Sequence, residues 1–119
     1  MDKLNENKPP IIFGNGKQTR DFIHVDDVAR AFYLVLKYAK KSFDVFNLAT
    51  GKSTSINELA RMFLMVTNKS KLKPIHKKSI PGIVVCSSTN PKKIKKNLHF
   101  NPSINLHDGI TKFVKFSTS

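Results

Sequence analysis

Apolar residues recur at helical spacing in two early segments of the chain. The first segment carries apolar residues on one face, which predicts an amphipathic helix over residues 26–40: Val25, Val28, Ala29, Phe32, Val35, Leu36 and Ala39. The second begins at a capping box formed by Ser55 and Glu58, ahead of Ile56, and ends near Asn68.

Two further helices are predicted toward the C-terminus. Asn90 and Pro91 pair a capping residue with a proline at the first helical position, which predicts a short helix to about Leu98. A last helix begins near Asn105. Gly109 lies inside it and weakens this prediction, although one face is apolar: Leu106, Ile110, Phe113 and Val114.

Short apolar runs between these helices predict strands at Ile11–Phe13, at residues 21–25 and at residues 43–48. Two weaker patterns suit strands at 73–78 and 83–86. Strands that alternate with helices indicate an α/β fold.

The densest local pattern runs from Phe13 to Val28. Gly14-Asn15-Gly16 can adopt positive φ and lets the backbone approach a ligand or another segment closely. Arg20 follows this turn and presents a planar, charged fork that suits a phosphate. Asp26 and Asp27 can cap the next helix and complement its dipole.

This run resembles one in the extended short-chain dehydrogenase/reductase family, the NAD-dependent epimerases and dehydratases of nucleotide sugars. The resemblance covers nearly all of residues 9–116, in the family's order. It continues through these segments: Phe46–Gly51, Ser55–Leu59, Pro81-Gly82, Ser88–Lys93, Leu98–Pro102 and Leu106–Ile110.

The resemblance implies an incomplete fold, because a whole enzyme of this family also needs a dinucleotide-binding domain. The 119 residues suffice for one small domain, and they contain no Gly-x-Gly-x-x-Gly or Gly-x-x-Gly-x-x-Gly loop. Residues 1–119 are therefore expected to form a single C-terminal substrate-binding portion. Residues 1–8 are expected to be the remnant of a preceding helix, which Pro9-Pro10 ends.

Three residues are candidate ligand contacts by resemblance. Arg20 matches the arginine that contacts the diphosphate of the sugar nucleotide, and the strand with Ile11 and Phe13 matches the wall of the base pocket. The residues also allow plainer interpretations: Arg20 could pair with Asp21 or Asp26 at the surface, and Phe13 could belong to the core.

The chain departs from the family where many members have Arg-x-Gly-Asp. Ile80 and Ile83 replace the arginine, a second diphosphate contact, and the aspartate, which helps to hold the ribose or the loop. An isoleucine offers no donor or acceptor, and one charge-assisted contact contributes about 1.5–3 kcal/mol. We expect weaker substrate binding.

Tyr33 and Lys37 have the Tyr-x-x-x-Lys spacing of the family's catalytic pair. That pair belongs to the dinucleotide domain, well upstream of this helix. We therefore interpret Tyr33 as a residue at the edge of the apolar face and Lys37 as a solvated lysine, and expect no catalytic residue in this chain.

Charge is unevenly distributed: residues 1–60 carry nine Lys/Arg against seven Asp/Glu, and residues 61–119 carry twelve against one. The second half could bind an anionic partner. Eighteen of the twenty-one basic residues are lysines without interleaved arginine and aromatic residues, a pattern that argues against nucleic acid. The lysine-rich pattern is also typical of a solvated surface that binds no partner.

Several other classes are disfavoured. Residues 1–10 lack the apolar core of a signal peptide, and no apolar run is long enough to span a membrane. Cys86 is the single cysteine, which indicates a cytoplasmic protein with an ordinary strand thiol. The four histidines are scattered, so no metal site is expected.

Three hypotheses follow. The leading one is the substrate-binding portion of an NAD-dependent nucleotide-sugar epimerase or dehydratase, which binds a UDP-sugar-like ligand and is inactive alone. NAD would be bound elsewhere, by a dinucleotide-binding part that a separate chain could supply. The alternatives are a non-enzymatic basic module for an anionic partner and a decayed gene fragment.

Overall fold

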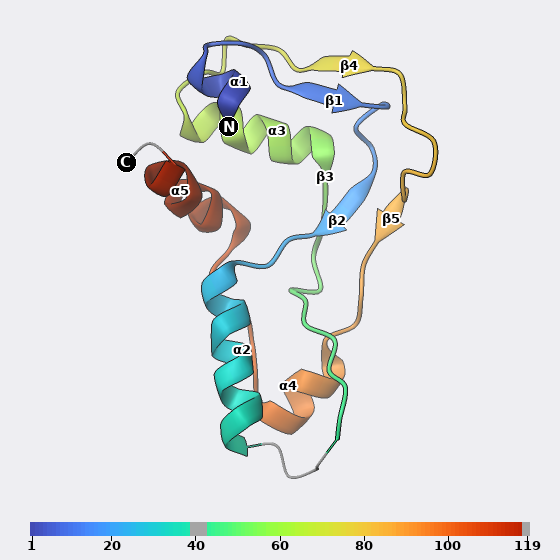
Figure 1. Cartoon of the computed structure of the whole chain (residues 1–119), viewed down its shortest axis with the longest axis vertical. Helices are drawn as coiled ribbons and strands as arrows, with labels where there is room; N and C mark the ends of the chain where they lie inside the picture. Colours follow the sequence, from blue (N-terminus) through green and yellow to red (C-terminus); the bar gives the residue numbers. More distant parts are fainter. Residues whose placement is uncertain (39–42, 118–119) are drawn as a thin grey trace.

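A computed structural model describes residues 1–38 and 43–117 of the chain (Figure 1). Its elements follow one another as α1 (Asp2–Asn5), β1 (Ile11–Phe13), β2 (Thr19–Asp21), α2 (Val25–Tyr38), β3 (Ser53–Ser55), α3 (Ile56–Val66), β4 (Ile75–Lys77), β5 (Cys86–Ser87), α4 (Lys92–Leu98) and α5 (Leu106–Ser117). The short strands and the helices confirm the predicted α/β class.

The described strands form two small sheets. β1 pairs in parallel with β4, so that Ile11 lies opposite Ile75 and Phe13 opposite Lys77. β2 is the middle strand of the other sheet, antiparallel to β3 and parallel to β5. In Figure 1 this second sheet lies between α2 and α4 at one end of the molecule and β1, β4 and α3 at the other.

The capping box at the start of α3 is present as predicted. Ser55 Oγ accepts from the Glu58 backbone N–H at 3.2 Å, and Glu58 Oε2 accepts from the Ser55 N–H at 2.8 Å. The next two backbone N–H groups donate to the loop after β1: Ile56 to the carbonyl of Gln18 and Asn57 to that of Gly16, each at 3.0 Å. All the first-turn donors named here are therefore satisfied within the chain.

Gly16 shows why this loop needs glycine. Its φ of +69° is in the left-handed region, and a Cβ built on it would lie 2.1 Å from Asn57 Oδ1. The close approach allowed by Gly14-Asn15-Gly16 is thus to α3. A side chain at position 16 would push the turn off the helix.

The amphipathic helix predicted over residues 26–40 is confirmed as α2, with residues 39 and 40 outside the described part of the chain, but most of its predicted apolar face is exposed, including Val25, Phe32 and Leu36. Ala31 is buried together with α4 residues Ile94 and Leu98 and with Phe100. Ile23, Leu34, Val35, Phe46 and Leu48 pack against this cluster. These residues form the main core.

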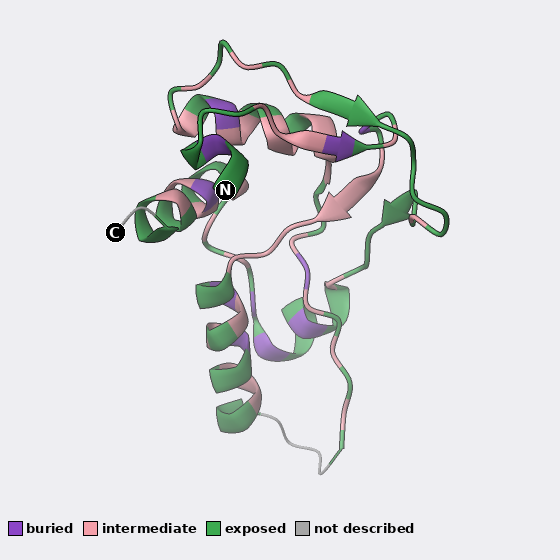
Figure 2. Cartoon of the chain, turned by 45° about the horizontal axis from the view of Figure 1, so that its top comes forward, coloured by how far each residue is buried: buried purple, intermediate pink, exposed green. Residues whose placement is uncertain are grey.

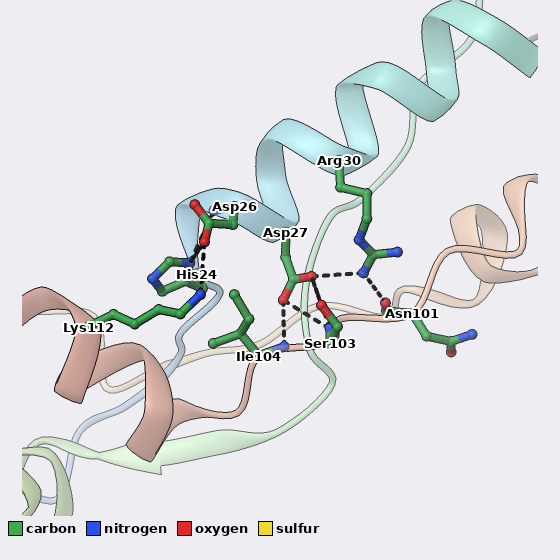
Figure 3. A network of polar contacts seen from close by, with 8 residues as sticks. All are labelled: His24, Asp26, Asp27, Arg30, Asn101, Ser103, Ile104 and Lys112. Atoms are coloured by element: carbon green, nitrogen blue, oxygen red, sulfur yellow. Dashed lines mark hydrogen bonds and ion pairs between the residues drawn. The ribbon is translucent and has the colours of Figure 1, made fainter.

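Asp27 does not cap α2 but anchors the loop before α5 (Figure 3). Its carboxylate, 1% exposed, accepts from the backbone N–H groups of Ser103 and Ile104 at 3.0 Å and from Ser103 Oγ at 2.9 Å. Arg30 donates to the same carboxylate at 2.8 Å and also to the carbonyl of Asn101. The contacts of Asp27 with Ser103 and Ile104 and that of Arg30 with Asn101 thus join α2 to the C-terminal segment.

These donors control the ionisation of Asp27. Burial alone would raise the pKa of this carboxyl, but the hydrogen bonds from Arg30, Ser103 and Ile104 together hold its pKa far below the ordinary value. The guanidinium of Arg30 also lies 4.7 Å from the centre of the Phe100 ring, which keeps it close to the core.

Two strand predictions were wrong. β2 covers Thr19–Asp21, while the apolar residues after it leave the sheet and pack toward the core and α5. Residues 43–48 form no ladder, although their side chains alternate between exposed and half-buried. The alternation is present, but no described strand lies beside them to complete the hydrogen bonds.

The strands and helices predicted for the second half of the chain are present, with shifted boundaries. β4 lies within the predicted 73–78, whereas β5 overlaps the predicted 83–86 only at Cys86. Asn90 Oδ1 accepts from the Lys92 N–H at 3.0 Å, but Pro91 is the N-cap of α4, which therefore begins at Lys92, one residue later than expected. α5 continues through Gly109, where a Cβ would lie 3.2 Å from the His24 ring.

The chain is flat and extended for its length. Its extents are 51 × 35 × 17 Å, and its radius of gyration is 16.9 Å, against about 13.5 Å for a compact chain of this size. Its accessible surface of 8646 Å² exceeds the roughly 6,500 Å² expected for its mass. Figure 2 shows how few segments are buried.

Replacing Asp27 with asparagine should destabilise the fold strongly. An amide presents one oxygen where the carboxylate satisfies five contacts, so we expect a loss of about 3–5 kcal/mol in the free energy of unfolding. Asp26→Asn is the matched control, since Asp26 is exposed and should cost less than about 1 kcal/mol. Urea denaturation at pH 7 measures both, and equal losses would contradict the prediction.

The same carboxylate predicts a pH dependence. Its pKa is lowered in the folded state, so its contribution is complete above the unfolded-state pKa of about 3.9 and is lost as the pH falls through and below that value. Between pH 6 and 3 the wild type should lose stability more steeply than Asp27→Asn. Parallel pH profiles would show that Asp27 is not the cause.

A pair of glycine variants separates packing from backbone strain. Gly16 and Gly82 both have positive φ, of +69° and +82°, but nothing lies within 4 Å of a Cβ on Gly82. Gly82→Ala should cost about 1 kcal/mol of strain, and Gly16→Ala about 1–3 kcal/mol more through overlap with Asn57. Thermal unfolding compares the two, and equal costs would exclude the packing explanation.

Candidate functional site

Arg20 lies half-buried in the middle strand of the larger sheet. Its neighbours are Thr54 on β3 and Ser87 on β5, both uncharged. Its Nη1 donates to the carbonyl of Thr19 at 2.7 Å. Within residues 1–38 and 43–117, no carboxylate pairs with this guanidinium, so the surface ion pair considered as its plainer role is wrong.

The carboxylates near Arg20 in sequence bind elsewhere. Asp21 accepts from the backbone N–H of Thr50 at 3.0 Å, from Thr50 Oγ1 at 2.5 Å and from the Gly51 N–H at 2.7 Å. Asp26 pairs with Lys112 at 3.1 Å. The charge of Arg20 therefore remains available for an anion.

Ile11 and Phe13 lie on β1, at the other side of the glycine turn from Arg20. Ile11 is half-buried, whereas Phe13 is 42% exposed, so Phe13 is not a core residue. Gln18 Nε2 donates to the Phe13 carbonyl at 3.0 Å and folds the turn back toward β1. An exposed aromatic ring beside a fixed backbone can serve as a flat wall for a base.

The loop after β4 runs along the same turn. The Gly14 N–H donates to the Lys77 carbonyl at 2.9 Å, and Ser79 Oγ lies 3.5 Å from the Cβ position of Gly14. Ile80 follows at 50% exposure, and Ile83 is half-buried. Ile80 and Ile83, which replace the arginine and aspartate of many family members, thus lie in this loop and present apolar side chains.

Sequence reasoning missed Asn57 and His76. Asn57 Nδ2 donates to the carbonyl of Asn15 at 2.9 Å, and its Oδ1 lies 3.0 Å from His76 Nε2. The sequence did hold one indication of Asn57: an asparagine, which is a poor helix former, lies between the two residues of the capping box. Its partners are distant in sequence, so the pattern alone could not name them.

Tyr33 and Lys37 are surface residues of α2, as interpreted. The Lys37 ammonium lies 5.6 Å from the centre of the Tyr33 ring and 5.1 Å from that of Tyr38. Hydrogen bonds to Tyr38 and then to Tyr33 raise the pKa of Lys37. This lysine is a solvated partner of two rings on an exposed helix face.

A cavity of about 730 Å³ lies apart from the predicted site. It is mainly apolar and is lined by the segment after β2, by α3 and by α5, including Leu59, Phe63 and Phe113. The rings of Phe63 and Phe113 meet edge to face at 6.1 Å. Ile11, Phe13 and Arg20 are not among its lining residues, so the predicted ligand contacts lie outside this cavity.

The glycine turn and the start of α3 do not fit an NAD site. The one Gly-x-Gly turn has its Gly16 carbonyl and its inner space occupied by Asn57, and the first-turn donors of α3 are used within the chain. Among the described residues no cluster of His, Cys, Asp or Glu could hold a metal ion, and no helix is long and apolar enough to cross a membrane.

Comparison with known proteins agrees with this arrangement. The family model of GDP-mannose 4,6 dehydratase matches residues 2–113. A putative UDP-glucose 4-epimerase from Methanocaldococcus jannaschii is 36% identical over 118 residues, which cover 98% of this chain and 36% of that protein. The chain thus spans about a third of the length of this relative.

Solved structures give the same result. UDP-glucose 4-epimerase from Thermotoga maritima, with UDP-glucose, superposes with a TM-score of 0.87 at 29% identity over 99% of this chain and 38% of that one. UDP-glucuronic acid 4-epimerase from Bacillus cereus, in complex with UDP-glucuronic acid and NAD, gives a TM-score of 0.85 at 29% identity over 97% of this chain and 38% of that one.

The matched region is the C-terminal part of such enzymes. The chain therefore belongs to the GDP-mannose 4,6 dehydratase family, among the NAD-dependent epimerases and dehydratases of the extended short-chain dehydrogenase/reductases.

Proposed function

We propose that this chain supplies the nucleotide-sugar-binding portion of an NAD-dependent epimerase or dehydratase, with a UDP-sugar-like ligand. The observation that supports it most is the half-buried Arg20 guanidinium, which has no carboxylate partner in the described residues and lies just after the turn that follows Phe13. A diphosphate would accept from Arg20 while a base lies against Ile11 and Phe13.

The relatives support this choice of ligand. The Thermotoga maritima epimerase was solved with UDP-glucose, and a UDP-N-acetylglucosamine 4-epimerase of similar fold with UDP-N-acetylmuramic acid. The apolar Ile80 and Ile83 imply that this chain holds its ligand through fewer charged contacts, so affinity depends strongly on Arg20.

Catalysis needs a dinucleotide-binding part in addition to these residues. The chain is flat, and its accessible surface is roughly 2,000 Å² larger than that expected for a compact chain of its mass. Such a shape is expected when another layer of structure packs against the chain. Val25, Phe32 and Leu36 form an exposed apolar stripe along α2, at 70%, 66% and 86% exposure. A dinucleotide-binding part, which a separate chain could carry, would cover this stripe.

Residues 43–48 also support packing against a dinucleotide-binding part. Phe43 and Val45 are 82% and 63% exposed, while Phe46 and Leu48 pack on the core. Apolar side chains on both faces are typical of a strand in a parallel sheet that is covered on both sides. The segment from Val45 to Ala49 makes no backbone-to-backbone hydrogen bond with another described segment, so it could join such a sheet.

The basic surface supports the competing function, an anion-binding module. Lys92, Lys95 and Lys96 are exposed on α4. α4 lies at the opposite end of the molecule from β1 and β4 (Figure 1), so the two hypotheses place the ligand at different sites. Binding measurements on separate variants therefore distinguish them.

Arg20→Ala should weaken UDP binding by about 10- to 150-fold, because one charge-assisted contact contributes about 1.5–3 kcal/mol. Arg20→Lys should recover part of this loss, since a lysine keeps the charge without the bidentate geometry. Isothermal titration calorimetry with UDP measures each affinity. The matched control is Lys95→Ala, which removes one exposed charge on α4 and should leave the affinity unchanged.

Two outcomes would reject this assignment. Either Arg20→Ala binds UDP as the wild type does, or Lys95→Ala weakens binding as much as Arg20→Ala. The second outcome would favour the anion-binding module, particularly if binding to heparin also falls steeply with salt.

The purified chain should not epimerise UDP-glucose, even with added NAD⁺, because its residues offer neither a dinucleotide loop nor a buried tyrosine–lysine pair. Analysis of the sugar nucleotides by chromatography after incubation tests this. NAD-dependent formation of the C4 epimer by the chain alone would contradict the proposal.

A further inference from the structure

The side chain of Asn57 joins three segments that are far apart in sequence. Its Nδ2 donates to the carbonyl of Asn15 in the turn after β1, at 2.9 Å. Its Oδ1 lies 3.0 Å from Nε2 of His76, which stands in β4. Asn57 itself belongs to the first turn of α3, so one amide connects this helix, the turn and a strand of the smaller sheet.

Backbone contacts reinforce this junction. The Asn57 N–H donates to the carbonyl of Gly16 and the neighbouring Ile56 N–H to that of Gln18, each at 3.0 Å. Gly16 is buried, and its missing Cβ leaves the space that the Asn57 amide fills. The turn is thus held against the helix at three carbonyls, those of residues 15, 16 and 18.

This turn sets the geometry of the candidate site. Residues 14–18 connect β1, which carries Phe13, to β2, which carries Arg20. β4 pairs with β1, so the His76 contact fixes the smaller sheet to the same helix. The larger sheet is fixed to it as well, because β3 runs directly into α3 and pairs with β2. Asn57 therefore lies where the positions of Phe13 and Arg20 are set relative to each other.

We propose that Asn57 is a positioning residue that fixes the spacing between the base wall at Phe13 and the diphosphate contact at Arg20. This inference rests on the proposed function. Asn57 needs no contact with the ligand, because it acts through the turn. Its effect is specific to ligands that occupy both subsites at once, since only these gain from a fixed spacing.

The test compares one spanning ligand with its two fragments. Asn57→Ala should weaken UDP binding at least 10-fold, while uridine and inorganic pyrophosphate, each confined to one subsite, should change less than twofold. NMR titration of the full chain measures all three affinities. The control Asn97→Ala changes an exposed amide on α4 and should leave all three unchanged.

Variants at His76 test the connection to β4. Gln can place an amide donor near the position of the His76 Nε2, so His76→Gln should bind UDP within about twofold of the wild type, and His76→Ala should weaken it. The combined variant Asn57→Ala/His76→Ala should lose no more than Asn57→Ala alone, because the two residues act as one unit.

Three results would overturn the inference: UDP affinity unchanged in a folded Asn57→Ala, parallel loss of all three ligands, or independent, additive losses at Asn57 and His76. Amide hydrogen exchange of the free protein gives a readout that needs no ligand. Asn57→Ala should speed exchange in residues 14–20 at least 10-fold more than in α2. If the wild type binds no UDP, the proposed function fails, and unchanged exchange would separately exclude the positioning role.

Discussion

The carboxylate of Asp27 binds the loop between α4 and α5 to the first turn of α2, and the arrangement of the helices depends on this contact. Five donor contacts converge on a side chain that is 1% exposed. Because they hold its pKa low, the carboxylate stays charged at neutral pH and each contact is charge-assisted. Without it the segment from Asn101 to Ile104 would lose its main polar attachment to α2.

The candidate site depends on a second junction, between the glycine turn and α3. There the helix uses its free backbone donors on the turn, and Gly16 admits the Asn57 side chain. This junction leaves Arg20 and Phe13 on opposite sides of one short loop, both accessible to a ligand. A loop held by these hydrogen bonds between an aromatic ring and a cation supports the proposed nucleoside-diphosphate ligand more than the exposed lysines of α4 do.

The sequence predicted the features whose causes are local. The capping box at Ser55, the periodicity of α2 and the glycine turn each depend on neighbours within a few residues. It failed where the cause is distant: β2 ends at Asp21 because its partners β3 and β5 are short. Asn57 was missed for the same reason, since its partners lie 42 and 19 residues away.

The proposed function requires a ligand site at the glycine turn and Arg20. An NMR titration of the isotope-labelled chain with UDP-glucose tests it most directly, because it maps the contact without any substitution. We expect saturable chemical-shift changes that centre on residues 11–20. Changes that centre on the α4 lysines, or no saturable change at all, would contradict it.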